Sequence, residues 1–419
     1  MREFLKKGAQ LAAGPALGQL LAFAALPIIA RLYSADQFGT FSVFIVFCNA
    51  LGAISTLSIE RTLFHVKDRL LRLNLLFVAF LAVLVIAASA IALLPLYGAT
   101  FSMDLNVAVG SHFALLGGAI VVARGLYQIS FIEALSAQSY AAVSWAGLLK
   151  DVARVSSRIG LGVSALNPLG LYLSAFVDWL AGAVFLVVSS HINPVRRSSS
   201  FWRRAFRART IAGARRTIAR HYELLVYLAP ANLLSVVAPQ LPLLAMASFT
   251  DAEYVGIYAM AFLVLDRPTR IFAKSAGELF VSLVLRSRGG ASSWIRIFSV
   301  QVCIAAVGIF AACVLLAGLG QKIFGEEWAG IGMISFAAAP HVLALFLGEV
   351  TLASLAFGGK SRWILMRQSL SIAVMSLLGF SILLIFDRAL VAVAAMGTGH
   401  LLVQGIFAVK LRSGTKSNV

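Results

Sequence analysis

Apolar residues run through this chain in long blocks that short polar segments interrupt. The hydrocarbon core of a bilayer is about 30 Å thick, so an α-helix needs about 20 predominantly apolar residues to cross it. Twelve blocks reach that length, and the pattern therefore predicts twelve membrane-spanning helices. Their approximate ranges are 9–30, 38–59, 75–96, 108–132, 140–165, 169–190, 222–248, 254–285, 294–318, 330–356, 364–386 and 389–409.

Composition supports this prediction. Hydrophobic residues make up 60% of the 419 residues, charged residues make up 12%, and the mean hydropathy is +0.91. A soluble core of this length could not bury so much apolar surface. The chain is therefore predicted to be an all-α integral membrane protein. Spanning helices tolerate the Gly and Pro found in several blocks, because neighbouring helices satisfy the freed backbone groups.

The chain contains an internal repeat. Pro15 and Pro27 recur 215 residues later as Pro230 and Pro242, although the whole chain has only 10 prolines. Each pair lies in the first predicted span of one half. Two similar halves can rock about a site held between them, which is typical of transporters.

A shorter echo follows each proline pair, at residues 38–41 and 255–258. The repeat predicts two pseudo-repeated six-helix lobes, an N-terminal lobe at 1–195 and a C-terminal lobe at 222–419. A basic cytoplasmic linker at 196–221 joins them.

Basic residues favour one side of the predicted membrane. With the amino terminus inside, the cytoplasmic segments hold 25 of the 35 Lys and Arg residues, and the opposite side holds only Arg31, Lys322 and Arg388. By the positive-inside rule both termini are cytoplasmic. The same asymmetry explains most of the net charge of +18, so no nucleic-acid partner is predicted. In the linker, aromatic residues interleave with arginines, which fits either an amphipathic helix on anionic membrane lipids or a solvated connection.

The three cysteines predict no special chemistry. Cys48, Cys303 and Cys313 all lie in apolar blocks, where a thiol acts as a small hydrophobe. They indicate neither a disulfide nor a metal site, and no cofactor is predicted. A cleavable signal after Lys6 and Lys7 is an alternative for the first block. It is disfavoured because cleavage would delete a span that has a counterpart in the second half.

Charged residues inside predicted spans carry the main functional signal. An ionised side chain at the bilayer centre costs roughly 2.5–3.5 kcal/mol on insertion scales, so it normally faces a protein-lined aqueous cavity or a partner. Two spans, the fifth and the eighth, each hold a ladder of three bases at spacings of three or four, which places each ladder on one helix face. The ladders are Lys150, Arg154 and Arg158, and Arg267, Arg270 and Lys274.

The ladders predict a shared cationic cavity, because they belong to opposite halves and Arg124 in the fourth span can add to its wall. Such a cavity would attract a multiply anionic group, above all diphosphate, for which guanidinium supplies forked donors. The alternatives are structural ion pairs that lock helices together and charges that snorkel to the interface. Acidic neighbours lie within one turn: Asp151 near Arg154, Asp266 near Arg270 and Glu278 near Lys274.

Other polar residues in the spans give weaker signals. Asp178 and Glu349 are candidates for coupling to a proton or cation, and each is equally suited to partner a nearby base. His341 and His400 each fit hydrogen-bonded packing better than a proton relay. Tryptophans such as Trp179 suit the interfacial aromatic belt.

The predicted outer loops are short. The longest, near 97–106 and 320–330, offer about ten residues each. A membrane glycosyltransferase or polysaccharide polymerase would present a larger loop with clustered acidic or His groups. The sequence therefore favours a carrier over an enzyme.

Three segments resemble one family. Residues 26–39 (LPIIARLYSADQFG), residues 256–261 (GIYAMA) with Pro268, and residues 324–328 (FGEEW) are similar to Wzx-type polysaccharide flippases. These belong to the multidrug/oligosaccharidyl-lipid/polysaccharide (MOP) exporter superfamily.

The resemblance implies two six-helix lobes around a cationic cavity that opens alternately to each side of the bacterial inner membrane. It implies transport of undecaprenyl-diphosphate-linked oligosaccharides, with a proton or sodium gradient implicated in some members. Arg31 matches the basic residue that ends the family's first span. The family's basic residue before Pro268 is replaced here by Leu263, so substrate roles do not transfer residue by residue to the eighth span.

The sequence thus predicts a flippase for lipid-linked repeat units of O-antigen, capsule or exopolysaccharide, with a polysaccharide polymerase and a chain-length regulator as further partners. The alternatives are a peptidoglycan-precursor flippase, another MOP exporter of organic cations and, least favoured, a membrane glycan polymerase. The predicted substrate-binding residues are Arg31, Arg124, Lys150, Arg154, Arg158, Arg267, Arg270 and Lys274.

Overall fold

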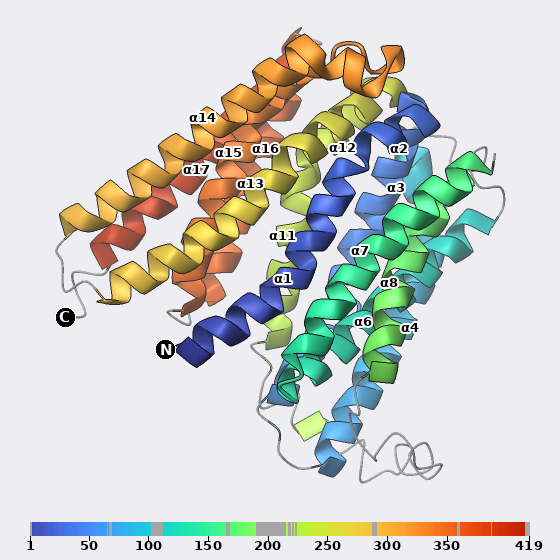
Figure 1. The fold of residues 1–419 in the computed structure, drawn as a ribbon, viewed down its shortest axis with the longest axis vertical. Coiled ribbons are helices and arrows are strands. Elements are labelled where there is room, and N and C mark those ends of the chain that lie inside the picture. Colours follow the sequence, from blue (N-terminus) through green and yellow to red (C-terminus); the bar gives the residue numbers. More distant parts are fainter. Residues whose placement is uncertain are drawn as a thin grey trace. The chain divides into compact units, whose positions relative to one another are not determined.

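The computed structural model is helical throughout the residues that it describes (Figure 1). These residues are 2–64, 66, 69–101, 112–164, 168–189, 215–216, 219, 222, 224–286, 291–357, 361–386 and 388–414. Most of the predicted basic linker at 196–221 lies outside them. The predicted all-α class is confirmed for these residues.

The chain forms two compact units. The first unit comprises Met1–Tyr33 and Phe44–Leu233, and the second comprises Ser34–Val43 and Leu234–Val419. The helix α3 (Ala35–Ile54) therefore contributes its first turns to the second unit and the rest to the first.

In the first unit, α7 packs between α1 and α8, and these three helices run side by side (Figure 1). The helix α6 packs against both α4 and α8. The elements are α1 (Arg2–Ala24), α2 (Leu26–Leu32), α3, η1 (Ile59–Phe64), α4 (Arg69–Thr100), α6 (Phe113–Ser136), α7 (Tyr140–Val163), α8 (Leu169–Ser189) and η3 (Leu224–Leu228).

In the second unit, α15 is the central helix, and α13, α14 and α17 pack around it. The helix α16 packs against α17. The elements are α11 (Ala229–Val237), which begins in the first unit, η4 (Ala238–Gln240), α12 (Leu241–Phe249), α13 (Ala252–Arg286), α14 (Ala291–Phe324), η5 (Glu326–Trp328), α15 (Ile331–Phe357), α16 (Ser361–Phe386) and α17 (Ala389–Gly414).

The packing repeats between the units. In the first, α4 packs on α6, α6 on α8 and α7 on α8. In the second, the equivalent helices pair in the same way, α14 on α15, α15 on α17 and α16 on α17. Each unit is thus built on one plan, as the internal sequence repeat predicts.

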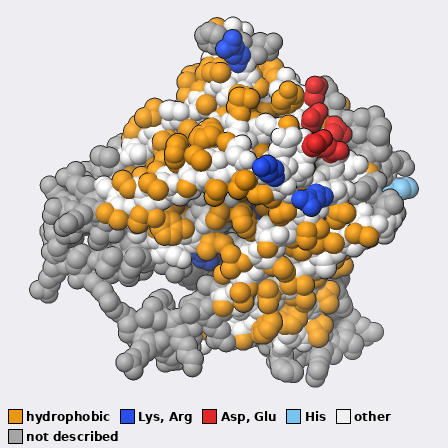
Figure 2. Space-filling model, turned by 45° about the horizontal axis from the view of Figure 1, so that its top comes forward, with side chains coloured by type: hydrophobic (Ala, Val, Ile, Leu, Met, Phe, Trp, Pro, Cys, Tyr) orange, Lys and Arg blue, Asp and Glu red, His pale blue; other side chains and the backbone are white. Residues whose placement is uncertain are grey.

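Nine helical segments among the described residues are long and apolar enough to cross a membrane. The pair α1 and α2, bent by 44° where they meet, makes a tenth if it counts as one span. The two remaining predicted ranges, 140–165 and 254–285, coincide with α7 and α13, which hold the charge ladders. Large apolar side chains are exposed on the described surface, such as Leu384 and Val188, and hydrophobic side chains spread over the face drawn in Figure 2. Acyl chains suit such a surface.

The repeated prolines occupy equivalent positions. Pro27 is the second residue of the short helix α2, and Pro242 is the second residue of the short helix α12. A proline at the start of a helix removes no intrahelical hydrogen bond, but it prevents the preceding helix from continuing. Both short helices then end on extended backbone, at Tyr33 and at Thr250. The proline repeat therefore marks where the first span of each half is broken.

The two echo segments pack against each other in the second unit. A Cβ added to Gly39 would collide with the backbone carbonyl of Ala252, and one added to Gly256 would collide with that of Ala35. Only glycine permits this approach of α3 to α13. The fully buried Trp328 packs edge-on against Phe38, with ring centroids 5.9 Å apart. All three family-like segments thus contribute to one packed cluster.

Candidate functional site

The basic ladder of α7 faces α8. Lys150, Arg154 and Arg158 follow the four-residue spacing of one helix face, whereas Trp145 and Val163 on α7 are exposed. The ladder is matched along α8 by Trp179, Asp178 and Ser174, in the order expected for antiparallel neighbours. The prediction of one charged face on the fifth span is therefore confirmed.

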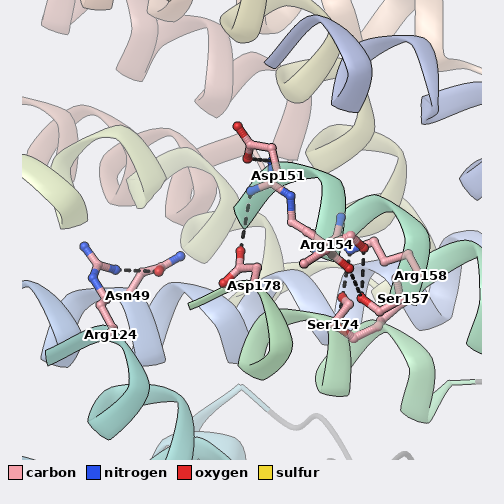
Figure 3. Close-up of polar contacts among 10 residues, drawn as sticks. Asn49, Arg124, Asp151, Arg154, Ser157, Arg158, Ser174 and Asp178 are labelled. Carbon is pink, nitrogen blue, oxygen red and sulfur yellow. Dashed lines mark hydrogen bonds and ion pairs between the residues drawn. The ribbon is translucent and has the colours of Figure 1, made fainter. Parts of the chain in front are cut away.

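Arg154 joins two carboxylates. It forms an ion pair with Asp151 on its own helix, and its Nη1 lies 3.6 Å from Oδ2 of Asp178 on α8 (Figure 3). The side chain of Asp178 is only 6% exposed, and its Oδ1 has no hydrogen-bond partner. The predicted Asp151–Arg154 pair is confirmed. Asp178 partners this base and keeps one buried oxygen free.

Arg158 connects α7 to α8 and to the residue that follows α2. It is buried and donates from Nε to Oγ of Ser174 at 2.9 Å (Figure 3). Its backbone carbonyl accepts a bond of 2.8 Å from the Tyr33 hydroxyl. Burial raises the pKa of Tyr33, although the nearby Arg158 opposes this. Tyr33 therefore stays protonated and remains the donor.

Lys150 and Arg124 share one aromatic ring. The Nζ of Lys150 lies 3.8 Å from the centroid of the Trp179 ring, and the guanidinium carbon of Arg124 lies 5.0 Å from it. The Tyr127 ring is 5.7 Å from Lys150. A cation over an aromatic face gains about 0.5–2 kcal/mol, which is less than desolvation of a full charge costs.

Neither of these two cations forms an ion pair within the described part of the chain. Arg124 donates to Oδ1 of Asn49 on α3 (Figure 3), but its buried Nε has no partner. Both side chains are only partly buried. Lys150 and Arg124 are therefore the bases of this cluster that are left to meet an anion.

The charges in this cluster do not cancel. Four bases, Arg124, Lys150, Arg154 and Arg158, accompany two carboxylates, Asp151 and Asp178, which leaves a surplus of two positive charges (4 − 2). Diphosphate carries complementary charge and several acceptor oxygens. No group of three or more metal-ligating side chains occurs within the residues described.

Close packing of α1 and α7 supports the cluster. The backbone N–H of Gly14 donates to Oγ of Ser144 at 2.9 Å. A Cβ on Gly18 would meet the carboxylate of Asp151 at 2.5 Å. Gly14 and Gly18 form a small-xxx-small pattern, which allows spanning helices to approach closely. This pattern was readable in the sequence but was not used in the site prediction.

Trp179 was also missed as a site residue. Its residue type predicts a place in the interfacial belt, whereas it lies in the middle of α8 beneath Lys150 and Arg124. Its position next to Asp178, inside a predicted span, was the available signal.

The second unit places its predicted residues differently. Arg270 on α13 forms an ion pair with Asp266, with Nε 2.6 Å from Oδ2, as predicted, and its side chain is 43% exposed. Arg267 is half-buried on α13, and Lys274 is exposed there. Glu349 is exposed on α15. The Glu278 side chain, the predicted partner of Lys274, lies outside the described residues.

Arg31 is separate from both ladders in sequence position and environment. It lies in the last turn of α2, and its side chain is exposed. The predicted residues are thus distributed as a cluster in the first unit, a row on α13 in the second, and Arg31 at the end of the first span.

Comparison with solved structures defines the class of fold. The chain aligns over 96% of its length with the whole of an inward-facing MATE-family multidrug resistance transporter of the MOP superfamily, with a TM-score of 0.65 at 10% identity. It aligns over 97% of its length with 87% of the lipid II flippase MurJ in an inward closed conformation, with a TM-score of 0.66 at 11% identity. The chain therefore has the fold of MOP superfamily transporters.

A third neighbour is a MOP superfamily transporter from Pyrococcus furiosus, described as having a binding pocket of reverse polarity that suggests a different function. The alignment covers 98% of this chain and 96% of the neighbour, with a TM-score of 0.60 at 13% identity. No model of a known protein family matches the sequence, and no curated protein sequence matches it.

Proposed function

We propose that this protein is a flippase that moves undecaprenyl-diphosphate-linked oligosaccharide repeat units from the cytoplasmic to the periplasmic leaflet of the bacterial inner membrane. Both termini lie in the cytoplasm, and alternating access drives the movement without covalent chemistry. The products serve O-antigen, capsule or exopolysaccharide synthesis, with a polymerase and a chain-length regulator acting on the translocated units.

The surplus of two positive charges around Trp179 carries this proposal. Lys150 and Arg124 form no ion pair among the residues described, although Asp178 attracts both, and an anion at this position would relieve their mutual repulsion. A diphosphate on the cluster would accept hydrogen bonds from both. Arg154 and Arg158 are already bonded to residues of α8. They position the cluster and keep the electrostatic potential around it positive.

The row on α13 is the second binding element of the proposal. Arg270 and Lys274 have exposed head groups, and Arg267 lies one turn before them. They attract an anionic head group or acidic sugars. Arg31 receives the substrate at the end of the first span. The weaker candidates Asp178 and Glu349 couple transport to an ion, and the free Oδ1 of Asp178 suits a proton.

Comparison supports a lipid-linked substrate by analogy only. The neighbour MurJ is named as a lipid II flippase, and the Pyrococcus transporter is described by reversed pocket polarity. A peptidoglycan precursor carries the same diphosphate, so it remains the second candidate. Export of organic cations would require an acidic site, whereas the clusters here are predominantly basic.

Charge reversal tests the proposal in cells. A strain that lacks this gene is complemented with the wild type, Lys150→Glu, Arg270→Glu or the control Lys322→Glu, whose base is an exposed one at the end of α14. The first two variants are expected to abolish surface glycan and to accumulate single lipid-linked units on the cytoplasmic leaflet, with membrane abundance unchanged. Normal glycan display from both would overturn the binding assignment, and accumulation of periplasmic unpolymerised units would indicate a polymerase instead.

A further inference from the structure

Two buried histidines meet inside the second unit. His341 lies on α15 and His400 on α17, and their Nδ1 atoms are 3.2 Å apart. Both side chains are almost fully buried, with residue exposures of 0% and 2%. A Cβ on Gly397 would approach the backbone nitrogen of His341 to 2.7 Å, so glycine is needed where α17 brings the rings together. The two histidines are 59 positions apart in the sequence, so neither one indicates the other.

The pair belongs to a longer chain of hydrogen bonds. Nε2 of His341 lies 3.0 Å from the carbonyl oxygen of Pro239, in the break between α11 and α12. Nε2 of His400 lies 3.0 Å from Nε2 of Gln404. That amide nitrogen donates to Oγ of Ser371 on α16 at 3.2 Å. The chain therefore links the broken seventh span to α15, α17 and α16.

Donor and acceptor rules assign the protons along this chain. A carbonyl only accepts, so His341 carries its proton on Nε2, and its Nδ1 is the acceptor when the ring is neutral. His400 must then donate from Nδ1, which leaves its Nε2 as an acceptor for the Gln404 amide. Every bond in the chain is satisfied with both rings neutral. The structure thus represents the state without an added proton.

One group in the chain is left without a partner. Gln404 is only 1% exposed, and its buried Oε1 makes no hydrogen bond. If the amide turns over, Oε1 replaces Nε2 opposite His400, where it accepts from a protonated His400 Nε2. Ser371 can reverse its bond, because a hydroxyl both donates and accepts. The same side chains can therefore hold one more proton, and the turned amide then leaves its two N–H groups at the position where Oε1 now has no partner.

We infer that His341 and His400 form a binding site for one proton, which Gln404 gates by turning its amide. The proton enters at the Nε2 lone pair of His400, and the shared positive charge strengthens the bond from His341 to the Pro239 carbonyl. Proton binding therefore ties the break of the seventh span to α15. The proton site itself does not depend on the proposed function. Only its role in coupling proton binding to transport rests on that function.

Burial disfavours a charged pair, and the charged groups around the pair act in addition. Arg270 on α13 acts on His341, and Arg367 on α16 acts on His400. Glu349 on α15 acts on both arginines. Arg367 is fixed by bonds from Nη1 to the Gly348 carbonyl at 2.8 Å and to Thr351 at 2.6 Å, and it is only 1% exposed. Arg270 and Arg367 are positive and therefore oppose protonation of the histidine pair in the conformation seen here. The surroundings of the pair must change before it takes up a proton.

Nuclear magnetic resonance of the full-length protein in lipid nanodiscs tests the site itself. The chain has only six histidines, so labelling their imidazole nitrogens with ¹⁵N gives few signals, which His341→Gln and His400→Gln assign. We expect the Nε2–H tautomer at His341, the Nδ1–H tautomer at His400, and joint conversion to one shared imidazolium as the pH falls. A His400 in the Nε2–H tautomer at neutral pH, or rings that titrate independently, would overturn the inference.

Gln404→Glu tests the proposed gate by adding a negative charge beside His400, in the same kind of nanodisc sample. A carboxylate only accepts, so this variant is expected to hold the pair protonated at neutral pH, whereas Gln404→Leu leaves it neutral. His112→Gln, at an exposed histidine in the first unit, is the matched control and should change neither signal. A neutral pair in Gln404→Glu would contradict the gate.

Transport in proteoliposomes tests the coupling separately. Wild-type flipping of a fluorescent undecaprenyl-diphosphate oligosaccharide is expected to accelerate under an imposed pH gradient, and His400→Gln should lose that acceleration while keeping gradient-free flipping. Wild-type flipping that ignores the gradient would refute the coupling but leave the proposed function intact. Absence of all flipping, with the expected resonance result, would refute the proposed function and leave the proton site standing.

Discussion

Individual charges in this protein differ in how far their surroundings already satisfy them. Arg158 and Arg367 are buried and bonded within their units, whereas Lys150 and Arg124 rest on an aromatic ring and form no ion pair among the described residues. A buried charge without a counterion is expensive, and natural chains keep such residues mainly where a ligand completes the pairing. Within one ladder, the residues that can bind an anion are therefore distinguishable from those that hold helices together.

Substitution of Lys150 separates charge from packing. Lys150→Met keeps the length and apolar stem but removes the positive charge, so it is expected to reduce surface glycan at least ~10-fold, whereas Lys150→Arg retains most of it. Glycan is measured by gel ladder against membrane abundance of the same variant. Equal display from the Met and Arg variants would show that the charge does not serve transport.

The Asp178–Arg154 pair is expected to stabilise the first unit. Asp178→Asn and Arg154→Gln each leave a buried polar group with a weakened partner, and the double variant should lose less than the sum of the single losses. The expected coupling is about 1–3 kcal/mol. Thermal unfolding of the purified variants in one detergent measures it, and strictly additive losses would mean that the 3.6 Å contact contributes nothing.

At the scale of elements, two features interrupt or join the helices. Pro27 and Pro242 start short helices after a break, and glycines let α3 and α13 pack backbone to backbone. Both features repeat in the two halves. Breaks of this kind concentrate bending at defined places in the chain.

The glycine contact allows a matched test at this scale. Gly256→Leu must displace the α3 backbone, and overpacking of this kind costs about 1–3 kcal/mol or more. The midpoint of thermal unfolding should fall by several degrees. Gly308→Leu on α14 is the control, because a Cβ there has no neighbour within 4 Å. An equal effect of both substitutions would point to helix propensity instead of close packing.

Local pairs were predictable from the sequence, and distant partners were not. Asp151 with Arg154 and Asp266 with Arg270 follow from helical periodicity alone, and the structure confirms both. The meeting of Lys150 with Trp179, and that of His341 with His400, depends on which helices pack together and in which register. Hydropathy carries no information about helix rotation, so a histidine on α15 looks solitary until α17 is placed beside it.

At the scale of the whole molecule, the apolar blocks and the asymmetric basic residues determine insertion. The helices are as apolar as the pattern predicts, except α7 and α13, which carry the ladders. The helix α8 covers the charged face of α7, whereas Arg270 and Lys274 on α13 are exposed. The positive residues between the spans predict that both termini are cytoplasmic.

Orientation has its own test. Green fluorescent protein fused after Val419 is expected to fluoresce, because it folds in the cytoplasm, and alkaline phosphatase fused at the same place is expected to be inactive. Phosphatase inserted near Gly330, in a predicted outer loop, should be active. The reverse pattern of activities would place both termini outside.

The most direct measurement is translocation by the purified full-length protein in proteoliposomes, with fluorescent undecaprenyl-diphosphate oligosaccharide as substrate. We expect the wild type to expose the labelled head group to the opposite leaflet, and Lys150→Met combined with Arg124→Gln to lower this rate at least ~10-fold. Lys322→Gln should match the wild type. Equal rates for all three proteins, or transport of an organic cation in place of the anionic lipid, would contradict the central claim that the cluster around Trp179 carries a diphosphate.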